Sequence, residues 1–208
     1  QKLGIQGVWR GKNKQTTRSR DDQKRADDLV KRNFNADHPD QLWVADFTYI
    51  QTHSGWVYTA FIIDVFSRAI VGWKVSTRMN TDMVLDALEQ ALHDRGMPKN
   101  VIHHSDRGVQ YLSIRYTNRL EAANLRASVG TTGDSYDNAL AETVNGLYKT
   151  EVIEYLKADW QGLADVQLAT LNWVDWFNKE RVHSALGYVS PFEFEAMYYD
   201  KINPLGQV

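Results

Sequence analysis

Cysteine is absent from this chain of 208 residues. Without thiols the protein can hold no disulfide scaffold, no thiolate zinc site and no cysteine nucleophile, a composition typical of a reducing cytosol. Long hydrophobic runs are missing too, because the longest apolar stretches, residues 57–63 and 69–75, are far shorter than the roughly 20 residues that span a bilayer. The polar start of the sequence also lacks the apolar core of a signal peptide. We therefore expect a cytoplasmic protein that makes no membrane contact.

Acidic residues are lacking only at the amino-terminal end, where residues 1–20 hold six Lys or Arg and no acid. Residues 41–208 hold 14 basic and 20 acidic residues, so the formal net charge of -2 averages a basic arm and a mildly acidic body. Basic arms of this composition are typical of nucleic-acid contact and equally of solvated linkers. We predict an arm or linker over residues 1–40, in which residues 25–34 are compatible with a short helix, and one folded domain over residues 41–208.

Hydrophobic periodicity gives the folded part an order of strands and helices. Runs of β-branched and aromatic residues predict three strands joined by short turns into an antiparallel meander, at 42–51, 55–64 and 69–76. The elements predicted after them are a helix over 80–95, a strand at 101–104, a helix over 113–124, a strand at 125–128, and helices over 137–156 and 160–181. This order predicts one mixed α/β domain, in which helical crossovers add two parallel strands to the meander.

Three acidic residues stand at unusual positions in this pattern. Asp46 interrupts an otherwise apolar strand, where a carboxylate is disfavoured unless it has a partner or a metal. Asp106 follows the strand predicted at 101–104, and ligands of α/β sheets bind outside the carboxyl ends of strands. Glu142 lies near the start of a predicted helix that follows a Gly-containing loop. Carboxylates on three separate elements can converge on one point.

A convergent set of carboxylates without His or Cys favours Mg²⁺ or Mn²⁺ over zinc. Two such ions about 3.5 to 4 Å apart stabilise the attacking and the leaving oxygen of a phosphoryl displacement. The reaction class would then be hydrolysis or transfer of a phosphodiester. The chain has 26 acidic residues, however, so spacing alone is also explained by a chance triplet.

The sequences around these acids carry a specific resemblance. The segments LWVADFTYI, HHSDRGVQYLS and GDSYDNALAETVNGLYKTE resemble the signatures of DDE transposases and integrases, with 35 residues between Asp106 and Glu142. The later segment WFNKERVHSALGYVSPFEF resembles a motif of bacterial insertion-sequence transposases of the orfB type, with Phe177 where that motif usually has Tyr. The resemblance covers about residues 29–197, in four motifs in the right order.

The resemblance implies a ribonuclease H-like fold with a mixed five-stranded sheet flanked by helices. It implies that Asp46, Asp106 and Glu142 are the catalytic acids and bind two Mg²⁺ or Mn²⁺ ions. In that family, water cuts one strand at the end of the element, and the exposed 3′-OH then attacks a target phosphodiester without a covalent protein intermediate. The protein is accordingly expected to be a DNA transposase.

The partners implied are double-stranded DNA, namely the terminal repeats of the element and its target, and further copies of the chain on paired ends. The family normally has a helix-turn-helix region before this core, and residues 1–40 lack the two helices that it requires. Two alternatives remain, a nuclease or retroviral-type integrase of the same fold and a non-catalytic DNA-binding protein derived from a transposase. The carboxyl-terminal motif argues against the first and the intact triad of acids against the second.

Two residues after Glu142 are candidates for DNA contact. Asn145 lies three residues after Glu142 and Lys149 seven residues after it, so all three share one face of the predicted helix. Both side chains could contact a phosphate or the terminal base near the metal ions. A solvated lysine on an exposed helix explains Lys149 as well.

Three further basic residues are candidates of the same kind. Arg107 directly follows the second acid and could pair with a phosphate or with a carboxylate. Arg181 and His183 belong to the carboxyl-terminal motif and could bind DNA or support the site. A basic residue that ends a helix is the simpler explanation for them.

Overall fold

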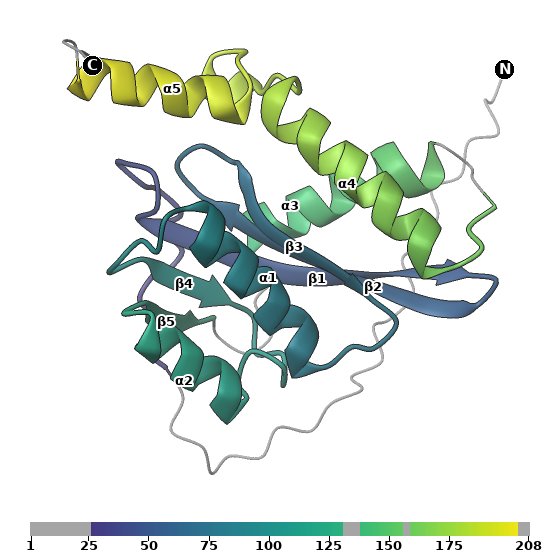
Figure 1. Ribbon diagram of the computed structural model, residues 1–208. Helices are drawn as coiled ribbons and strands as arrows, with labels where there is room; N and C mark the ends of the chain where they lie inside the picture. Colours follow the sequence, from purple (N-terminus) through teal and green to yellow (C-terminus); the bar gives the residue numbers. More distant parts are fainter. Residues whose placement is uncertain (1–25, 131–137, 156–158, 204–208) are drawn as a thin grey trace, which may run out of the picture.

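The computed structural model describes residues 26–130, 138–155 and 159–203, which form a five-stranded sheet with helices on both faces (Figure 1). The strands are β1 (Leu42–Thr52), β2 (Gly55–Asp64), β3 (Ile70–Ser76), β4 (Ile102–Ser105) and β5 (Arg126–Val129). The α-helices are α1 (Thr81–Asp94), α2 (Ile114–Ala122), α3 (Ala139–Tyr148), α4 (Leu163–Lys179) and α5 (Pro191–Ile202). A π-helix, η1 (Lys149–Glu154), follows α3, and a 3₁₀ turn, η2 (Ser184–Leu186), precedes α5.

The strand order is β3-β2-β1-β4-β5. Pairs β1–β2 and β2–β3 are antiparallel, whereas β1–β4 and β4–β5 are parallel. The predicted mixed sheet is therefore confirmed, and each strand begins and ends within one residue of the predicted bounds. The hairpins need only short turns, while each parallel neighbour is reached through a helix, α1 or α2.

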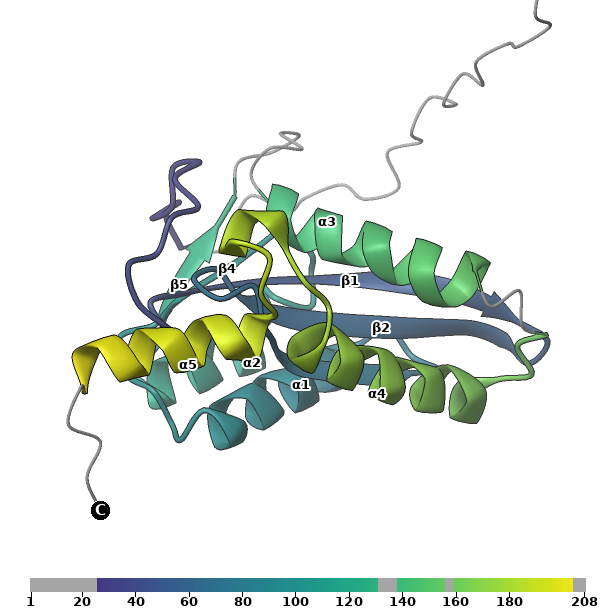
Figure 2. The same cartoon turned by 90° about the horizontal axis from the view of Figure 1, so that it is seen from above.

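Strand β1 is the centre of the fold because both of its faces are covered. Leu42, Val44 and Ile50 pack with residues of α3 and α4, while Trp43 and Ala45 pack on the other face with residues of α1 and α2. The view from above shows α3 along one side of β1 and β2 and helices α1 and α2 on the other (Figure 2). A strand buried on both faces explains the nearly continuous apolar run in which Asp46 stands.

Strand β1 is much longer than its parallel neighbour β4. It pairs with β2 from Trp43 to Thr52 but with β4 only over Leu42–Ala45. From Asp46 onward, one edge of β1 therefore has no strand partner among the described residues. The sheet thus opens beside Asp46, at the carboxyl end of β4, which is the place where an α/β sheet offers room for a ligand.

The helices begin at residues that satisfy free backbone groups. Asn80 caps α1 by accepting the backbone N–H of Met83 at 3.2 Å, as its place in the sequence predicts. Ser113 does the same for α2, and Ser190 forms a capping box with Glu193 at the start of α5, where Pro191 is the first helical residue. These short-range signals fix the helix starts independently of the sheet.

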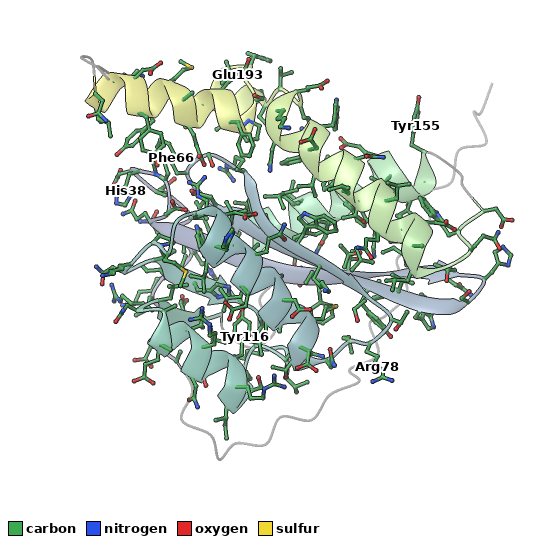
Figure 3. The ribbon with its side chains drawn as sticks, viewed as in Figure 1. His38, Phe66, Arg78, Tyr116, Tyr155 and Glu193 are labelled. Carbon is green, nitrogen blue, oxygen red and sulfur yellow. The ribbon has the colours of Figure 1, made fainter. Side chains whose placement is uncertain are left out.

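The carboxyl-terminal motif fastens α4 and α5 to the sheet. The buried amide of Asn178 accepts the backbone N–H of Ile70 at 2.8 Å and donates to its carbonyl at 2.9 Å, which joins the end of α4 to the edge strand β3. Phe66, in the turn between β2 and β3, packs under α5 against Phe194 and Tyr198, with both ring distances at 5.0 Å (Figure 3). The motif is thus accounted for in part by packing.

Two local predictions are wrong in detail. The helix expected over 137–156 is an α-helix only over Ala139–Tyr148 and continues as the π-helix Lys149–Glu154; residues 137 and 156 lie outside the described residues. Residues 26–34 form turns and bends instead of a helix, with Val30 buried in the core and the N–H of Leu29 donating to Ser128 Oγ at 2.9 Å. The basic residues 1–20 lie outside the described part of the chain.

Within the described residues, no helix is long and apolar enough to cross a membrane.

Close packing of α1 on β3 depends on Gly72. A Cβ at this position would lie 2.3 Å from the carbonyl oxygen of Ala87 and 2.9 Å from the Cβ of Ala91. We expect Gly72→Ala to lower the free energy of unfolding by about 2–4 kcal/mol in urea titrations, because helix and strand must move apart. The matched control is Gly146→Ala in α3, where a Cβ meets nothing within 4 Å, and a gain of about 0.5–1 kcal/mol is expected. Equal effects of the two substitutions would contradict this packing.

Candidate active site

Asp46 is the acid that the fold holds most firmly. Its Oδ1 accepts the backbone N–H of Phe47 at 2.8 Å, and its Oδ2 accepts the side-chain amide of Asn145 from α3 at 2.9 Å. The pKa of Asp46 is raised from 3.8 to about 7, chiefly by burial and then by the charges of Asp106 and, more weakly, Glu142, while the two hydrogen bonds act to lower it. The three predicted acids are therefore near enough to influence one another.

Asp106 directly follows β4, beside the open edge of β1. The residue is exposed, but its Oδ1 accepts the backbone N–H of Gly108 at 2.9 Å, and loss of water around the carboxylate raises its pKa. The preceding residues are fixed in the sheet: His104 pairs with Val44 and Ser105 with Ala45. The register of β4 on β1 thus places Asp106 at the level of Asp46 across the two strands.

Glu142 is exposed in the first turn of α3. The start of this helix is joined to β1 by Asn138, whose amide donates to the carbonyl oxygen of Ala45 at 3.0 Å. Asn145, one turn beyond Glu142, reaches Asp46. Two side-chain amides on either side of Glu142 therefore hold α3 against the part of β1 that carries the first acid.

The donor set of this site suits a hard divalent cation. Asp46, Asp106 and Glu142 offer only oxygen atoms, the ligands that Mg²⁺ and Mn²⁺ prefer. The amide oxygens of Asn138 and Asn145 are buried and have no hydrogen-bond partner in the described part of the chain. Among residues 26–130, 138–155 and 159–203, however, no three His or acidic residues are close enough to hold one ion. Burial and, after it, repulsion by the neighbouring acids raise the pKa of Asp46, and a cation bound between the carboxylates would relieve that repulsion.

Comparison with known proteins identifies the family. The integrase core domain matches residues 36–135 and, as a second family, residues 123–191. A transposase for insertion sequence element IS629 of Shigella sonnei is 56% identical over 200 residues, which cover 96% of this chain and 66% of that protein. A relative from Mycobacterium tuberculosis named for element IS986/IS6110 is 51% identical over 203 residues, which cover 95% of this chain and 73% of the relative. The chain belongs to the insertion-sequence transposases with an integrase core.

Solved structures agree with this assignment at the level of the fold. The catalytic core of HTLV-2 integrase, solved with magnesium, has a TM-score of 0.62 at 18% identity, covering 77% of this chain and 99% of that one. A chain of a simian T-cell lymphotropic virus intasome has a TM-score of 0.67 at 16% identity, and the match covers 83% of this chain and 58% of that one. The transposase therefore has the predicted ribonuclease H-like fold. It spans 66% of the IS629 protein, so the activity of the whole protein is a matter for proposal.

The structure places the two helical candidates for DNA contact differently. Asn145 is buried, and its amide donates to Asp46, so in this state it positions a carboxylate. Lys149 is partly exposed at the start of η1, with its Nζ 4.8 Å from the centre of the Tyr49 ring. A DNA role stays a prediction for both residues, but only Lys149 presents a charge that a phosphate can reach.

The other three candidates contribute to the structure of the transposase. Arg107 donates from Nε to the carbonyl oxygen of Gly130 at 2.8 Å, which links the ends of β4 and β5. Arg181 pairs with Glu151 of η1 at 2.8 Å, and His183 meets Phe177 edge to face with ring centres 4.9 Å apart. Burial lowers the pKa of His183. DNA contact by these residues stays a prediction.

Tyr111 lies near the acids, and no feature of the sequence marks it as part of the site. Its hydroxyl is buried without a hydrogen-bond partner among the described residues, and burial together with the charges of Tyr116, Asp46 and Asp106 holds its pKa well above 10.0. It lies five residues after Asp106, within the segment HHSDRGVQYLS, which resembles the family signature as a whole. An aromatic residue there reads as core, and only the fold brings its hydroxyl near the site.

The adjacent histidines of β4, His103 and His104, take structural roles. His103 Nε2 and the hydroxyl of Tyr116 lie 3.0 Å apart, and Figure 3 shows Tyr116 directed from α2 toward the sheet. His104 Nδ1 lies 2.9 Å from Ser128 Oγ of β5. Burial lowers the pKa of His103 to about 3, so its imidazole is neutral beneath the acids. Neither ring competes for a metal ion on the exposed side of Asp106.

The pKa of Asp46 offers a direct test of this geometry. We expect carbon NMR titration of the metal-free chain to show Asp46 titrating near 7, with a lower pKa in Asp106→Asn, which removes a neighbouring charge, and a higher pKa in Asn145→Ala, which removes a donor to the charged form. Asp86→Asn, at an exposed acid of α1 paired with Lys74, is the control and should change nothing. A pKa near 4 in every variant would contradict the arrangement.

Proposed function

We propose that this transposase core catalyses metal-dependent cleavage and joining of DNA strands at the ends of an insertion sequence, with Asp46, Asp106 and Glu142 as its catalytic acids. The observation that carries the proposal is the state of Asp46. A carboxylate in the central strand, with its pKa raised to about 7 by burial and by the other two acids, is costly for folding alone. Its surroundings are those of a group that acts with a bound cation.

The same residues would hold Mg²⁺ or Mn²⁺. Bound there in a pair, such ions would lower the pKa of the attacking hydroxyl and neutralise charge on the departing oxygen. Asp46 must lose its proton to become a ligand, so metal affinity should rise as the pH increases from about 6 to 8. Asn145 then holds one carboxylate oxygen in place, and the link from Asn138 to Ala45 keeps the start of α3 beside β1.

Joining of strands distinguishes this proposal from its alternatives. A nuclease of the same fold would cut DNA without joining it, and a non-catalytic relative would do neither. The 56% identity to a transposase over nearly the whole chain favours the joining activity. One structural neighbour is a viral intasome, and binding of paired element ends by more than one copy of this chain belongs to the same proposal.

The experiment is cleavage and strand transfer on a labelled duplex that ends in the terminal repeat of the chain's own element, with Mg²⁺ or Mn²⁺ present. We expect cleaved and joined products from the wild type and none after chelation of the metal. Asp46→Asn and Glu142→Gln should each lower the rate at least about 100-fold, since each removes a charge that stabilises the transition state.

The matched control is Glu121→Gln, at an exposed glutamate of α2 on a different element. It should keep the activity of the wild type. Wild-type rates in Asp46→Asn and Glu142→Gln would disprove the catalytic assignment. Cleavage without any joined product would favour the nuclease.

A further inference from the structure

Two aromatic side chains lie half exposed, side by side, on the hairpin of β1 and β2. Tyr49 is 55% and Trp56 is 49% exposed, and their rings meet edge to face with centres 5.3 Å apart. Rings of this size lose favourable burial when they stay in water, which makes an exposed pair a candidate binding surface.

A cation completes this surface. Lys149, the first residue of the π-helix η1, comes from the opposite side of the sheet and places its Nζ 4.8 Å from the centre of the Tyr49 ring. It can do so because β1 has no strand partner on this edge beyond Ala45. Short π-helical segments are rare and occur mainly at functional sites. Tyr49, Trp56 and Lys149 together are called the aromatic platform below.

The platform lies close to the acids. Tyr49 is three residues after Asp46 on the same strand, about 10 Å along it, and its side chain leaves the opposite face of the sheet at the edge that has no strand partner among the described residues. Lys149 is seven residues after Glu142 along α3, again about 10 Å. Strand β1 and the helix formed by α3 and η1 therefore carry two of the acids and also two residues of the platform, about three nucleotides of a stacked strand away from the phosphate.

The chemistry of the platform selects its ligand. Proteins that bind single strands combine aromatic rings, on which bases stack, with cations that contact the phosphates. An apolar protein segment would cover the rings but leave the charge of Lys149 without an anion, which is costly. Stacking covers both faces of every base pair inside a duplex and leaves open only one face of the terminal pair, so a base in the interior of a strand must be unpaired to lie against a ring.

We propose that the aromatic platform stacks an unpaired base of the DNA strand next to the phosphate held at the acids. The proposal rests on the proposed function, because it takes DNA as the substrate of the neighbouring site. It adds a feature to that substrate: the strand is opened beside the reacting phosphate, and the platform stabilises the opened form.

The test compares a blunt labelled duplex with a labelled duplex that has three unpaired nucleotides at its end. The second duplex is made in two versions, with the unpaired nucleotides on one strand or on the other. Binding of the chain is followed by fluorescence anisotropy in chelator, so that no cleavage occurs. We expect tighter binding of the duplex with unpaired nucleotides. Tyr49→Ala and Trp56→Ala should each weaken that binding about 5- to 100-fold and change binding of the blunt duplex less than about twofold.

Further variants separate stacking from folding and from charge. Tyr49→Phe keeps the ring and should bind as the wild type does, whereas Tyr49→Leu keeps apolar bulk and should bind as Tyr49→Ala does. Lys149→Gln should weaken binding of both duplexes, since a phosphate contact does not depend on an unpaired base. Tyr188→Ala, at a tyrosine that is 75% exposed before α5, is the matched control and should have no effect.

Abasic residues in place of the three unpaired nucleotides should remove the preference for the opened end. Equal loss on both duplexes in Tyr49→Ala, no loss on either, or no preference in the wild type would overturn the platform. A wild type that cleaves and joins DNA without the preference would leave the proposed function standing while the platform falls. If the chain prefers the duplex with unpaired nucleotides, and this preference depends on Tyr49, but the chain cleaves no DNA, the platform stands and the proposed function falls.

Discussion

A carboxylate in the central strand of the sheet is the constraint on which the rest of this structure depends. Strand β1 is covered on both faces, and Asp46 stands where the run of apolar residues would otherwise continue. Its charge is tolerated because the backbone of Phe47 and the amide of Asn145 donate to it, and because β4 ends one residue earlier in the register. The opening of the sheet leaves this group partly exposed, and the position of α3 brings it the amide of Asn145.

The surrounding elements follow from that requirement. Helix α3 must lie against β1 for Asn145 to reach Asp46, and Asn138 fixes its first turn to the carbonyl of Ala45. Strand β4 must stop short for Asp106 to face the same opening. Two residues of the carboxyl-terminal motif hold neighbouring elements in place: Arg181 pairs with Glu151 of η1, and Asn178 hydrogen-bonds to Ile70 of β3. The motif that identifies the family thus supports the helix that carries Glu142.

Much of the fold was predictable because its signals are local. The runs of β-branched and aromatic residues in β1 to β3 and the cap at Asn80 depend on neighbours within a few residues. The π-helix was not predictable, since six residues are too few for their period to be told from that of an α-helix. The exposure of Trp56 was not predictable either, because the sequence of β2 alone does not tell which of its residues the helices cover.

The three acids could be predicted from sequence motifs, but the side chains that contact them could not. Asn145 was expected to contact DNA, and the contact it makes joins residues that are 99 positions apart. Arg181 was a candidate for DNA as well and forms an ion pair with Glu151, 30 positions away. Spacing along a helix tells which side chains share a face. It does not tell which of them that face will bury.

The measurement that tests the central claim most directly is anomalous X-ray scattering from crystals of the chain soaked with saturating Mn²⁺. If the sheet opens at Asp46 to bind a cation, the strongest manganese peak will lie at about 2.1 Å from carboxylate oxygens of both Asp46 and Asp106. Manganese bound only elsewhere on the molecule, or an undisturbed hydrogen-bonded pair of Asp46 and Asn145 with no ion beside it, would contradict the account.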